Sequence, residues 1–535
     1  MIGLRRRGLL AAAGAGALAA CSPRPPGPQA IAGAQWHGVS HARGHRLREA
    51  RHNGLPPAAI TRRTDVLVIG AGIAGLAAAR ALQSEGIADI ALLELEDTAG
   101  GNSRGHTLGA QRCPLGAHYL PVPGDAAPEV RGWLAEIGLM RHQAGRWIAD
   151  ERHLAHSPQE RLFIDGAWHD GLLPPAEPGS ATLAQYRGFA QRVAAAQRLG
   201  FAMPTQRAPW TPEHAALDAL TFDAWLAREG LADRRLRWYL DYACRDDFGA
   251  GLGEVSAWAG LHYFASRHGF SAPGEGDGER DAVFTWPEGN AWLAERLAAP
   301  LGERLQPART VLQVSETREG VLVRAFDERA QRHEAWAARA VLLCVPLFVA
   351  ARLLDAPPDA LREVLTRQAH APWLVANLQL NAPLLDRLIG APPAWDNVRY
   401  GSASLGYVDA GHQRLDPSPQ PTVITLYWAL PRAQRGALLE EAAPAWAQRV
   451  VDELRPLHPD LPDKLERIVL TRYGHAMSIP VPGLRSSPAL AALAQASGRV
   501  RFAHADLSAY SVFEEAFTHG DGAGTKLARW LRAAA

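Results

Sequence analysis

The chain has 535 residues, of which 47% are hydrophobic and 21% are charged. These values are ordinary for a globular protein, and the length suffices for two or three domains. Because 56 basic residues are balanced by 55 acidic ones, with a net charge of +1, the composition argues against a nucleic-acid partner and against a polybasic membrane surface.

The first 21 residues have the pattern of an export signal. Three arginines precede a stretch of small apolar residues that ends at Cys21. Residues 6–10, Arg-Arg-Gly-Leu-Leu, resemble a twin-arginine signal, whose pathway carries folded proteins, and residues 18–21, Leu-Ala-Ala-Cys, resemble the lipobox of bacterial lipoproteins. We therefore expect lipidation of Cys21 and a lipid-anchored protein on the periplasmic side of a bacterial membrane. Release as a soluble protein after an A-x-A-like cleavage is the alternative.

Residues 22–61 are expected to form a tether. The first eight of them include four prolines, a composition typical of a stiff, extended linker, and ordered structure is expected to begin near Arg62. His37, His41 and His45 have a ligand-like spacing for a helix, but in this region we expect them to be unstructured. Elsewhere the chain has no run of eighteen apolar residues, so no transmembrane helix is predicted in the mature protein.

Cysteine and histidine spacing predict no metal site. Past Cys21 the chain has only Cys113, Cys244 and Cys344, an odd number without a CxxC pair, which also argues against a disulfide framework. Cys344 lies in an apolar run and is expected in the core. None of the twenty histidines occurs in an HExxH or related spacing.

Residues 66–94 have the pattern of a dinucleotide-binding unit. The apolar run 66–69 predicts a parallel strand buried on both faces, and Gly70, Gly72 and Gly75 follow it at the fingerprint spacing. The first glycine permits a tight turn, the second lets the backbone approach a pyrophosphate, and the third lets the helix pack closely against the strand.

The second half of this unit completes the pattern. A helix is expected over residues 73–86, and its N-terminal N–H groups, those of Ile73 and Ala74 among them, would face the phosphates. A second strand, residues 90–93, ends in Glu94. The fold places a carboxylate at this point to accept hydrogen bonds from a ribose 2′-hydroxyl.

A second glycine turn indicates which dinucleotide is bound. The stretch ELEDTAGGNSRG, residues 94–105, resembles the FAD-dependent amine oxidase and phytoene desaturase superfamily. LGAHYLP, residues 115–121, is similar to the segment that passes the isoalloxazine in these enzymes. The resemblance implies FAD contacts by Gly100, Gly101, Arg104, Gly116, Ala117 and His118.

Three later stretches resemble the same superfamily, at residues 284–326, 338–346 and 499–524. The resemblance implies that the backbone of Val311 contacts the adenine side and that Asp506 contacts the ribitol or the pyrophosphate. The closing helix would begin at Val512 and Phe513 and run to about Trp530. Its N-terminus would stabilise the negative charge of reduced flavin.

The chain also departs from the superfamily pattern. Thr98 and Asn102 occupy positions where the glycine motif usually carries arginines. No cysteine lies in the late region where monoamine oxidases attach flavin covalently, so FAD is expected to be bound non-covalently. The only lysines are Lys464 and Lys526, and neither lies in the strand that usually carries the lysine near flavin N5.

The resemblance implies an α/β fold, with a Rossmann-like FAD-binding domain assembled from discontinuous segments and an α+β substrate domain. The expected FAD-binding segments are residues 62–130, 283–350 and 495–535. The expected substrate-domain segments are residues 131–282 and 351–494. Within the substrate domain, residues 182–203 have a helical pattern and residues 373–380 and 422–430 have strand-like patterns.

The predicted function is an FAD-dependent oxidoreductase that transfers a hydride from a C–N or C–C bond of a small or lipid-like molecule to flavin N5. The catalytic candidates are His118, placed beside the flavin by its motif, and His475, interpreted either as a base with a pKa near working pH or as a structural histidine. Trp373, Tyr427 and Tyr510 would form either an aromatic wall or part of the core. For Asp246 and Asp247 we expect a solvated or salt-bridged turn.

Two alternative functions are open. The missing lysine and the expected lipid anchor favour a flavoprotein desaturase or isomerase that acts on a hydrophobic substrate. Since fold does not imply function, a non-catalytic lipoprotein in which FAD is structural is the other alternative.

Overall fold

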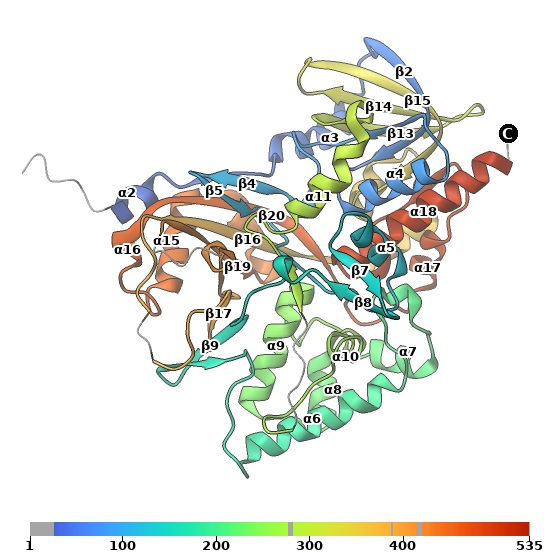
Figure 1. Ribbon diagram of the computed structural model, residues 1–535. Coiled ribbons are helices and arrows are strands. Elements are labelled where there is room, and N and C mark those ends of the chain that lie inside the picture. The colour runs from blue at the N-terminus through green and yellow to red at the C-terminus, as the bar shows by residue number, and fades with distance from the viewer. Residues whose placement is uncertain (1–25, 276–281, 387–388, 415–419, 534–535) are drawn as a thin grey trace, which may run out of the picture.

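The computed structural model describes residues 26–275, 282–386, 389–414 and 420–533. A seven-stranded and an eight-stranded sheet form its two main layers, and helices cover both (Figure 1). The predicted α/β fold is confirmed.

The seven-stranded sheet combines segments that are distant in the sequence. Its order is β12-β3-β2-β15-β14-β13, and β21 pairs with β15. Five strands, β12, β3, β2, β15 and β21, pair in parallel, and β13 to β15 form an antiparallel ribbon. The strands are β2 (Ile60–Ile69), β3 (Ile90–Leu93), β12 (Leu305–Gln306), β13 (Arg309–Glu316), β14 (Val321–Asp327), β15 (Arg332–Leu343) and β21 (Val500–Phe502).

Both faces of β2 are buried, as its apolar run predicts. Val66 and Val68 join an apolar cluster with helices α4 (Ile73–Ser84) and α18 (Phe513–Ala533). Leu67 and Ile69 join the cluster on the opposite face. The helices of that second cluster are α12 (Leu347–Leu353), α13 (Asp359–Arg367) and α17 (Pro488–Ala494).

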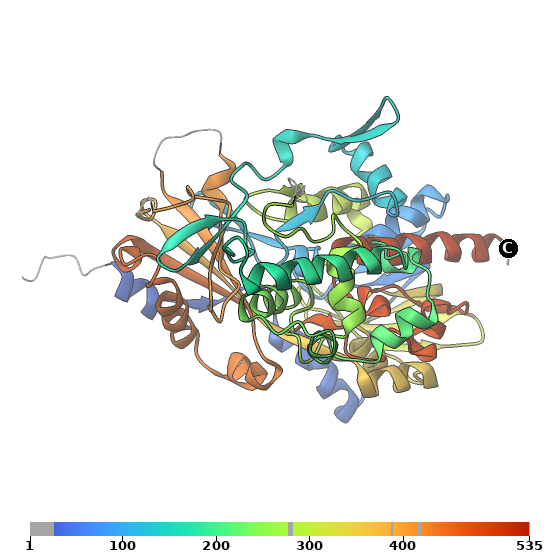
Figure 2. The ribbon, with the colours of Figure 1, turned by 90° about the horizontal axis from the view of Figure 1, so that it is seen from below.

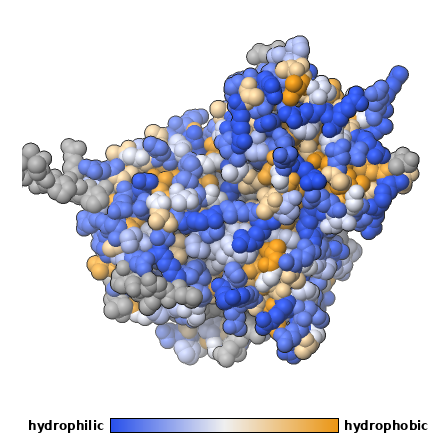
Figure 3. All heavy atoms as spheres, turned by 45° about the horizontal axis from the view of Figure 1, so that its top comes forward, coloured by the Kyte–Doolittle hydropathy of each residue, from blue (hydrophilic) through white to orange (hydrophobic). Residues whose placement is uncertain are grey.

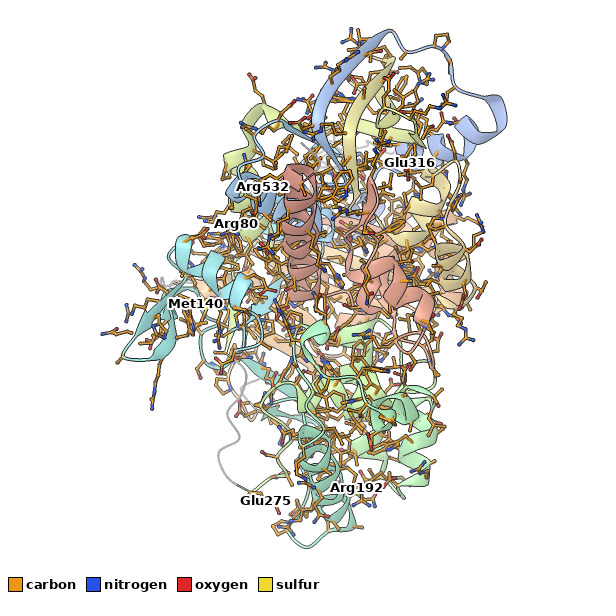
Figure 4. All side chains as sticks on the ribbon, turned by 90° about the vertical axis from the view of Figure 1, so that its right-hand side faces the viewer. Arg80, Met140, Arg192, Glu275, Glu316 and Arg532 are labelled. Atoms are coloured by element: carbon orange, nitrogen blue, oxygen red, sulfur yellow. The ribbon has the colours of Figure 1, made fainter. Side chains whose placement is uncertain are left out.

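The last helix, α18, fixes the position of α4. A Cβ atom on Gly520 would lie 2.0 Å from the carbonyl oxygen of Ala74, so only glycine allows the two helices to approach this closely. The side chains of Arg80 and Arg532 lie beside α18 (Figure 4) and form ion pairs with Asp521 at 3.6 Å and with Glu85 at 2.6 Å.

The eight-stranded sheet has the order β1-β20-β16-β19-β18-β17-β9-β10. The strand-like patterns at residues 373–380 and 422–430 correspond to β16 and β19. The strands are β1 (Gln35–Trp36), β9 (Glu160–Ile164), β10 (Ala167–Asp170), β16 (Ala369–Leu380), β17 (Asp396–Arg399), β18 (Tyr407–Asp409), β19 (Thr422–Ala429) and β20 (Leu465–Ile479).

Helices cover both faces of this second sheet. On one face lie α6 (Ala181–Gln197), α8 (Phe222–Arg228), α9 (Arg234–Phe248) and α10 (Ala257–Ala265), which are in front in the view from below (Figure 2). On the other face lie α2 (Pro26–Ala32) and α15 (Ala443–Leu454). The helical pattern at residues 182–203 is confirmed as α6, which ends at Gln197.

The remaining helices and strands connect these layers. They are α3 (His41–Asn53), α5 (Pro128–Glu136), α7 (Pro212–Asp218), α11 (Ala291–Ala298), α14 (Arg435–Glu440), α16 (Leu461–Lys464), β4 (Gly105–Leu108), β5 (Gln111–Pro114), β6 (Tyr119–Pro121), β7 (Met140–Gln143), β8 (Arg146–Ala149) and β11 (Val283–Thr285).

The prediction of a tether over residues 22–61 is wrong for residues 26–61. Pro26 and Pro28 lie in the first turn of α2, where proline is tolerated because those N–H groups need no helical partner. Ala30 and Ala34 are buried against the second sheet, so the segment is folded. Ordered structure therefore begins well before Arg62, and β2 itself begins at Ile60.

The predicted export signal and its lipidated Cys21 lie outside the described residues. Within the described part of the chain, none of the helices combines the length and hydropathy needed to cross a membrane. The face seen in Figure 3 is mostly hydrophilic, with scattered apolar patches. Cys344 is buried, which confirms its predicted place in the core, and Cys113 and Cys244 are buried as well.

Candidate functional site

The carboxyl ends of four parallel strands meet at one edge of the seven-stranded sheet. Gly70 follows β2, Glu94 follows β3, Cys344 follows β15 and Ala503 follows β21. In open α/β sheets, ligands bind outside this edge. The fingerprint predicted from the sequence therefore lies where such a fold binds its ligand.

The three fingerprint glycines have different physical roles. Gly70 adopts a φ of +98°, which favours glycine. A Cβ atom on Gly75 would lie 1.9 Å from the carbonyl oxygen of Gly70, so the turn and the helix could not pack together. At Gly72 the nearest atom to an added Cβ would be the Cα of Gly101, at 3.9 Å. Gly72 therefore leaves space in front of the helix.

The N-terminus of α4 faces this space. Among the described side chains, none caps the helix, whose N-cap residue is Gly72. Ile73 and Ala74 are nevertheless buried, with 6% and 3% exposure. A buried helix N-terminus without a cap requires a partner for its free N–H groups, and the phosphate of a dinucleotide is such a partner.

Glu94 is the acid at the end of β3. It is 7% exposed, and its two carboxylate oxygens accept hydrogen bonds from the N–H groups of Ala71 at 2.7 Å and Glu96 at 2.9 Å. Burial raises the pKa of Glu94 above its ordinary value. Each oxygen has a second lone pair that can accept from a hydroxyl, so the acid fits a ribose.

The second glycine turn packs against the first. The N–H of Gly100 donates to the carbonyl of Ala71 at 2.8 Å, and Gly100 and Gly101 both have positive φ. The Nε of Arg104 donates to the carbonyl of Gly101 at 3.0 Å, and an Nη lies 3.7 Å from Glu96. Arg104 thus lies beside the turn, and its contact with FAD stays a prediction.

The residues at this edge fit a dinucleotide. The open face of Gly72 and the uncapped α4 suit the phosphates, and Glu94 suits a ribose. Val311, predicted to lie at the adenine, is on β13, whose first residue donates its N–H to the carbonyl of Glu94 at 2.8 Å.

Asp506 also lies at this edge, in the short helical turn Ala505–Ser508 that follows β21. It accepts from the N–H of Leu347 at 2.9 Å and lies 3.3 Å from His370. Burial alone would raise the pKa of Asp506, but the neighbouring His504 and His370 hold it well below its ordinary value. These contacts join β21 to α12 and β16.

Helix α18 begins at Phe513, one residue after the predicted start at Val512. The ring of Phe513 stacks on Trp133 and Phe517 in the core below the sheet. Its side chain is therefore structural, and any cofactor contact here would come from the backbone of this helix terminus.

The segment containing Gly116, Ala117 and His118 leads from the glycine turns into the second domain. The N–H of Ala117 donates to the carbonyl of Asn102 at 2.8 Å. A Cβ atom on Gly116 would lie 2.2 Å from that same oxygen. The carbonyl of Gly116 accepts from the hydroxyl of Tyr427 at 3.0 Å. Gly116 and Ala117 thus contact both the second glycine turn, through Asn102, and the second sheet, through Tyr427.

His118 is the centre of what we call the aromatic cluster, formed with Tyr119, Trp395 and Tyr427. Its ring stacks on Tyr427 with centroids 4.1 Å apart and lies 4.9 Å from Tyr119 and 5.6 Å from Trp395. Burial lowers the pKa of His118 to about 3. His118 is therefore neutral at working pH and too weakly basic for a general base.

Two carboxyl groups adjoin the aromatic cluster. Asp246 accepts from the hydroxyl of Tyr119 at 3.2 Å, and burial, with neighbouring Asp247, raises the pKa of Asp246 to about 7. Burial also raises the pKa of Asp396 well above its ordinary value, with Glu160 and Asp246 nearby. His118, Tyr119, Asp246 and Asp396 are half-buried, whereas Trp395 and Tyr427 are buried.

The prediction of a solvated or salt-bridged turn at Asp246 and Asp247 is wrong about the turn, since both lie in the last turn of α9. Asp247 does form a salt bridge, to Arg267 at 3.2 Å, and it accepts from the hydroxyl of Tyr510. Both carboxyl groups point into the protein, where Asp246 contacts Tyr119 and Asp247 contacts Arg267.

The other aromatic candidates lie in the core. Trp373 is 8% exposed and Tyr510 1% exposed, and both belong to the apolar cluster between the second sheet and α6 to α10. Tyr427, which is 5% exposed, belongs to the same apolar cluster and is also the one of the three that lies in the aromatic cluster.

His475 does not have the pKa expected of a catalytic base. Burial and nearby positive groups, Arg435 first among them, lower the pKa of His475 to about 4. Its ring lies 4.8 Å from that of Phe348 and 6.0 Å from that of His370. The interpretation as a structural histidine agrees better with these surroundings.

Replacing Asp246 with Asn should change how stability depends on pH. The folded protein retains the proton on Asp246 up to about pH 7, whereas the unfolded chain loses it near 3.8, so the group's stabilising contribution is lost as pH rises between these values. As the pH rises from about 4 to about 7, the Tm of wild type should therefore fall relative to the Tm of Asp246→Asn. Above about pH 7 the difference between the two Tm values should stay constant. A difference that is flat across this range would contradict the protonated state of Asp246.

Sequence reasoning missed several residues near the site. Tyr119 directly follows His118 in the LGAHYLP segment. Trp395 and Asp396 carry no motif of their own, and only tertiary packing brings them to the aromatic cluster. A helical interpretation of DYACRDDF, residues 241–248, would have placed both acids on one helix end.

Two other features do not belong to this site. A surface pocket lined by Arg63, Asp89 and Arg304 lies at the amino ends of β2 and β3, the opposite edge of the sheet. Within the described residues, no group of three or more histidine, cysteine, aspartate or glutamate side chains could hold a metal ion.

A family model described as flavin containing amine oxidoreductase matches residues 73–523. The chain belongs to this family. The matched region begins at the first residue of α4, just after Gly72, and ends within α18. It includes Gly75, the second glycine turn, the aromatic cluster and Asp506.

Individual relatives are more distant. The flavin-containing amine oxidase B of Homo sapiens is 26% identical over 308 residues, which cover 56% of this chain and 53% of that protein. The chain thus matches about half the length of this relative. Cyclohexylamine oxidase from Brevibacterium oxydans superimposes with a TM-score of 0.65 at 18% identity, covering 89% of this chain and all of that one. A fatty acid isomerase from P. acnes does so with a TM-score of 0.59 at 18% identity, covering 86% of this chain and 97% of that one. These two likenesses support the fold.

Proposed function

We propose that the protein is an FAD-dependent oxidoreductase that removes a hydride from a C–N or C–C bond of a small or lipid-like substrate. The observation that carries the proposal is the continuity of residues 116–118. They touch the glycine turn through Asn102 and the aromatic cluster through Tyr427. A substrate at His118 would thus lie next to the dinucleotide site.

The chain's residues would hold FAD non-covalently. Glu94 would bind a ribose, and the N–H groups at the start of α4 would bind the pyrophosphate. Bound FAD would supply the hydride acceptor. The three described cysteines are all buried free thiols, and burial raises the pKa of the Cys113 thiol to about 12.

The aromatic cluster would orient the substrate and limit water access. Tyr119, Trp395 and Tyr427 present ring faces and edges around a neutral His118. Such surroundings suit an uncharged substrate, and an amine must be neutral to give up a hydride from its adjacent C–H bond. Asp246, whose pKa of about 7 lies near working pH, is the group beside this cluster best suited to accept a proton from an ammonium ion.

Anaerobic mixing of the flavin-loaded protein with primary and secondary amines tests this proposal. Bleaching of the flavin absorbance by an amine, slowed at least about tenfold in Asp246→Asn, is the expected result. Trp210→Ala, a change at an exposed aromatic residue, serves as the control and should bleach at the wild-type rate. If no amine or C–H donor reduces the flavin, the proposed oxidoreductase activity is wrong.

A desaturase or isomerase acting on a hydrophobic substrate is the second candidate function. It is favoured by the positions of the two lysines. Lys464 pairs with Asp460 at 2.7 Å, and Lys526 lies on the exposed side of α18, so neither lies in the aromatic cluster. Rapid bleaching by a simple amine would exclude this candidate.

We also propose that the protein is exported in folded form by the twin-arginine route and anchored through Cys21 on the periplasmic side of a bacterial membrane. The basic region and the Leu-Ala-Ala-Cys sequence support this. Cys21→Ala should move the protein from the membrane fraction to the soluble fraction of cells. Retention of the variant in the membrane fraction would contradict the anchor.

A further inference from the structure

The segment from Gln35 to Asn53, which we call the N-terminal strap, lies outside the region matched by the family model. It consists of β1, a connecting stretch and α3. Figure 1 shows it running from the second sheet beside β20 to α3 beside β13. The strap therefore connects the eight-stranded sheet to the seven-stranded sheet.

The strap is fastened at both ends. β1 pairs in parallel with β20, and the N–H of His37 donates to the carbonyl of Leu470 at 2.8 Å. At the other end Arg46 makes two hydrogen bonds to Glu328, both 3.1 Å long, and Leu47 is buried.

Between these ends, the strap contacts the three residues that follow Glu94. The N–H of Ser40 donates to the carboxylate of Glu96 at 2.9 Å. Arg43 donates to the carbonyl of Leu95 at 2.9 Å and to the carboxylate of Asp97 at 3.0 Å. Since the N–H of Glu96 in turn donates to Glu94, these contacts fix the turn that carries the predicted ribose acceptor.

The strap also offsets an unfavourable charge. Glu96 is mostly buried, with a side-chain exposure of 12%, and lies 3.7 Å from Arg104. A free carboxylate here would repel the pyrophosphate of a dinucleotide. Ser40 is the N-cap of α3, a helix of 13 residues, so Glu96 accepts its hydrogen bond at the positive end of a helix dipole.

We propose that the N-terminal strap is part of the cofactor site. Ser40 and Arg43 act as positioning residues: Ser40 at the N-terminus of α3 offsets the charge of Glu96, and Arg43 holds Leu95 and Asp97. Together they keep residues 94–97 in place and so slow the loss of the dinucleotide. This inference depends on one part of the proposed function, namely that the site binds FAD.

Release of FAD from the loaded protein, followed by the rise in flavin fluorescence after dilution, tests the strap. Ser40→Pro removes the N–H that donates a hydrogen bond to the carboxylate of Glu96. Because a hydrogen bond to a charged group is lost, FAD release should become about tenfold faster. Arg43→Ala should have a similar effect and provides the same test if Ser40→Pro does not fold. Glu49→Ala, an exposed change on the same helix, is the control and should release FAD at the wild-type rate.

A second substitution separates charge neutralisation from simple structural support. Glu96→Gln in the Ser40→Pro background removes the charge that needs neutralising, and release should return to within about twofold of wild type. If Ser40→Pro and Arg43→Ala both retain FAD as well as wild type, or if Glu96→Gln gives no rescue, the proposed role is wrong. A wild-type protein that binds no FAD would instead overturn the proposed function.

Discussion

Gly72→Val should abolish FAD binding while leaving the fold intact. Gly72 has a φ of −70°, which any residue adopts, and a Cβ atom there would meet no atom closer than 3.9 Å. The valine side chain would therefore fill the space proposed for the pyrophosphate without straining the protein. We expect FAD to bind at least about 100-fold more weakly, with the Tm of the cofactor-free protein unchanged.

Gly124→Val is the matched control for this prediction. An added Cβ at Gly124 meets nothing within 4 Å, and its φ is not positive, but it lies in a loop before α5. This control should bind FAD as tightly as wild type. Normal FAD binding by Gly72→Val would show that no pyrophosphate lies against this turn.

Asp247→Ala should destabilise the protein by about 3–5 kcal/mol, because it breaks a buried ion pair by removing the carboxylate that faces the guanidinium of Arg267. Asp247 and Arg267 have side-chain exposures of 3% and 12% and lie 3.2 Å apart. The change is measured as a shift of the urea unfolding midpoint. Replacing both residues, as in Asp247→Ala with Arg267→Met, should recover much of the loss.

The exposed pair Arg187 and Glu275 provides the comparison. Their side chains are 50% and 45% exposed, and Glu275 lies at the outer end of the helical region (Figure 4). Glu275→Ala should cost less than about 1 kcal/mol. If Asp247→Ala costs no more than Glu275→Ala, the buried pair does not support the junction between α9 and the segment that follows α10.

The dinucleotide-binding unit could be predicted from the sequence because each of its residues acts locally. Gly70 and Gly75 are required by backbone geometry within ten residues of chain, and Glu94 closes the next strand. The structure extends β2 back to Ile60, because pairing with β15 continues beyond the apolar run.

The substrate side could not be predicted in the same way. His118, Trp395 and Tyr427 are far apart in the sequence, and only the packing of the second sheet brings their rings together. The proline content of the N-terminal segment predicts an extended chain, whereas the structure folds it into α2, β1 and α3. The burial of Ala30 and Leu47 shows that tertiary contacts outweigh that local preference.

The flavin content of the purified protein tests the central claim most directly. The chain should bind FAD at one molecule per protein, give a yellow flavin absorbance, and release intact FAD into the supernatant on denaturation, since the three described cysteines are all buried thiols. A colourless protein that takes up no FAD when refolded or titrated with it would contradict the account.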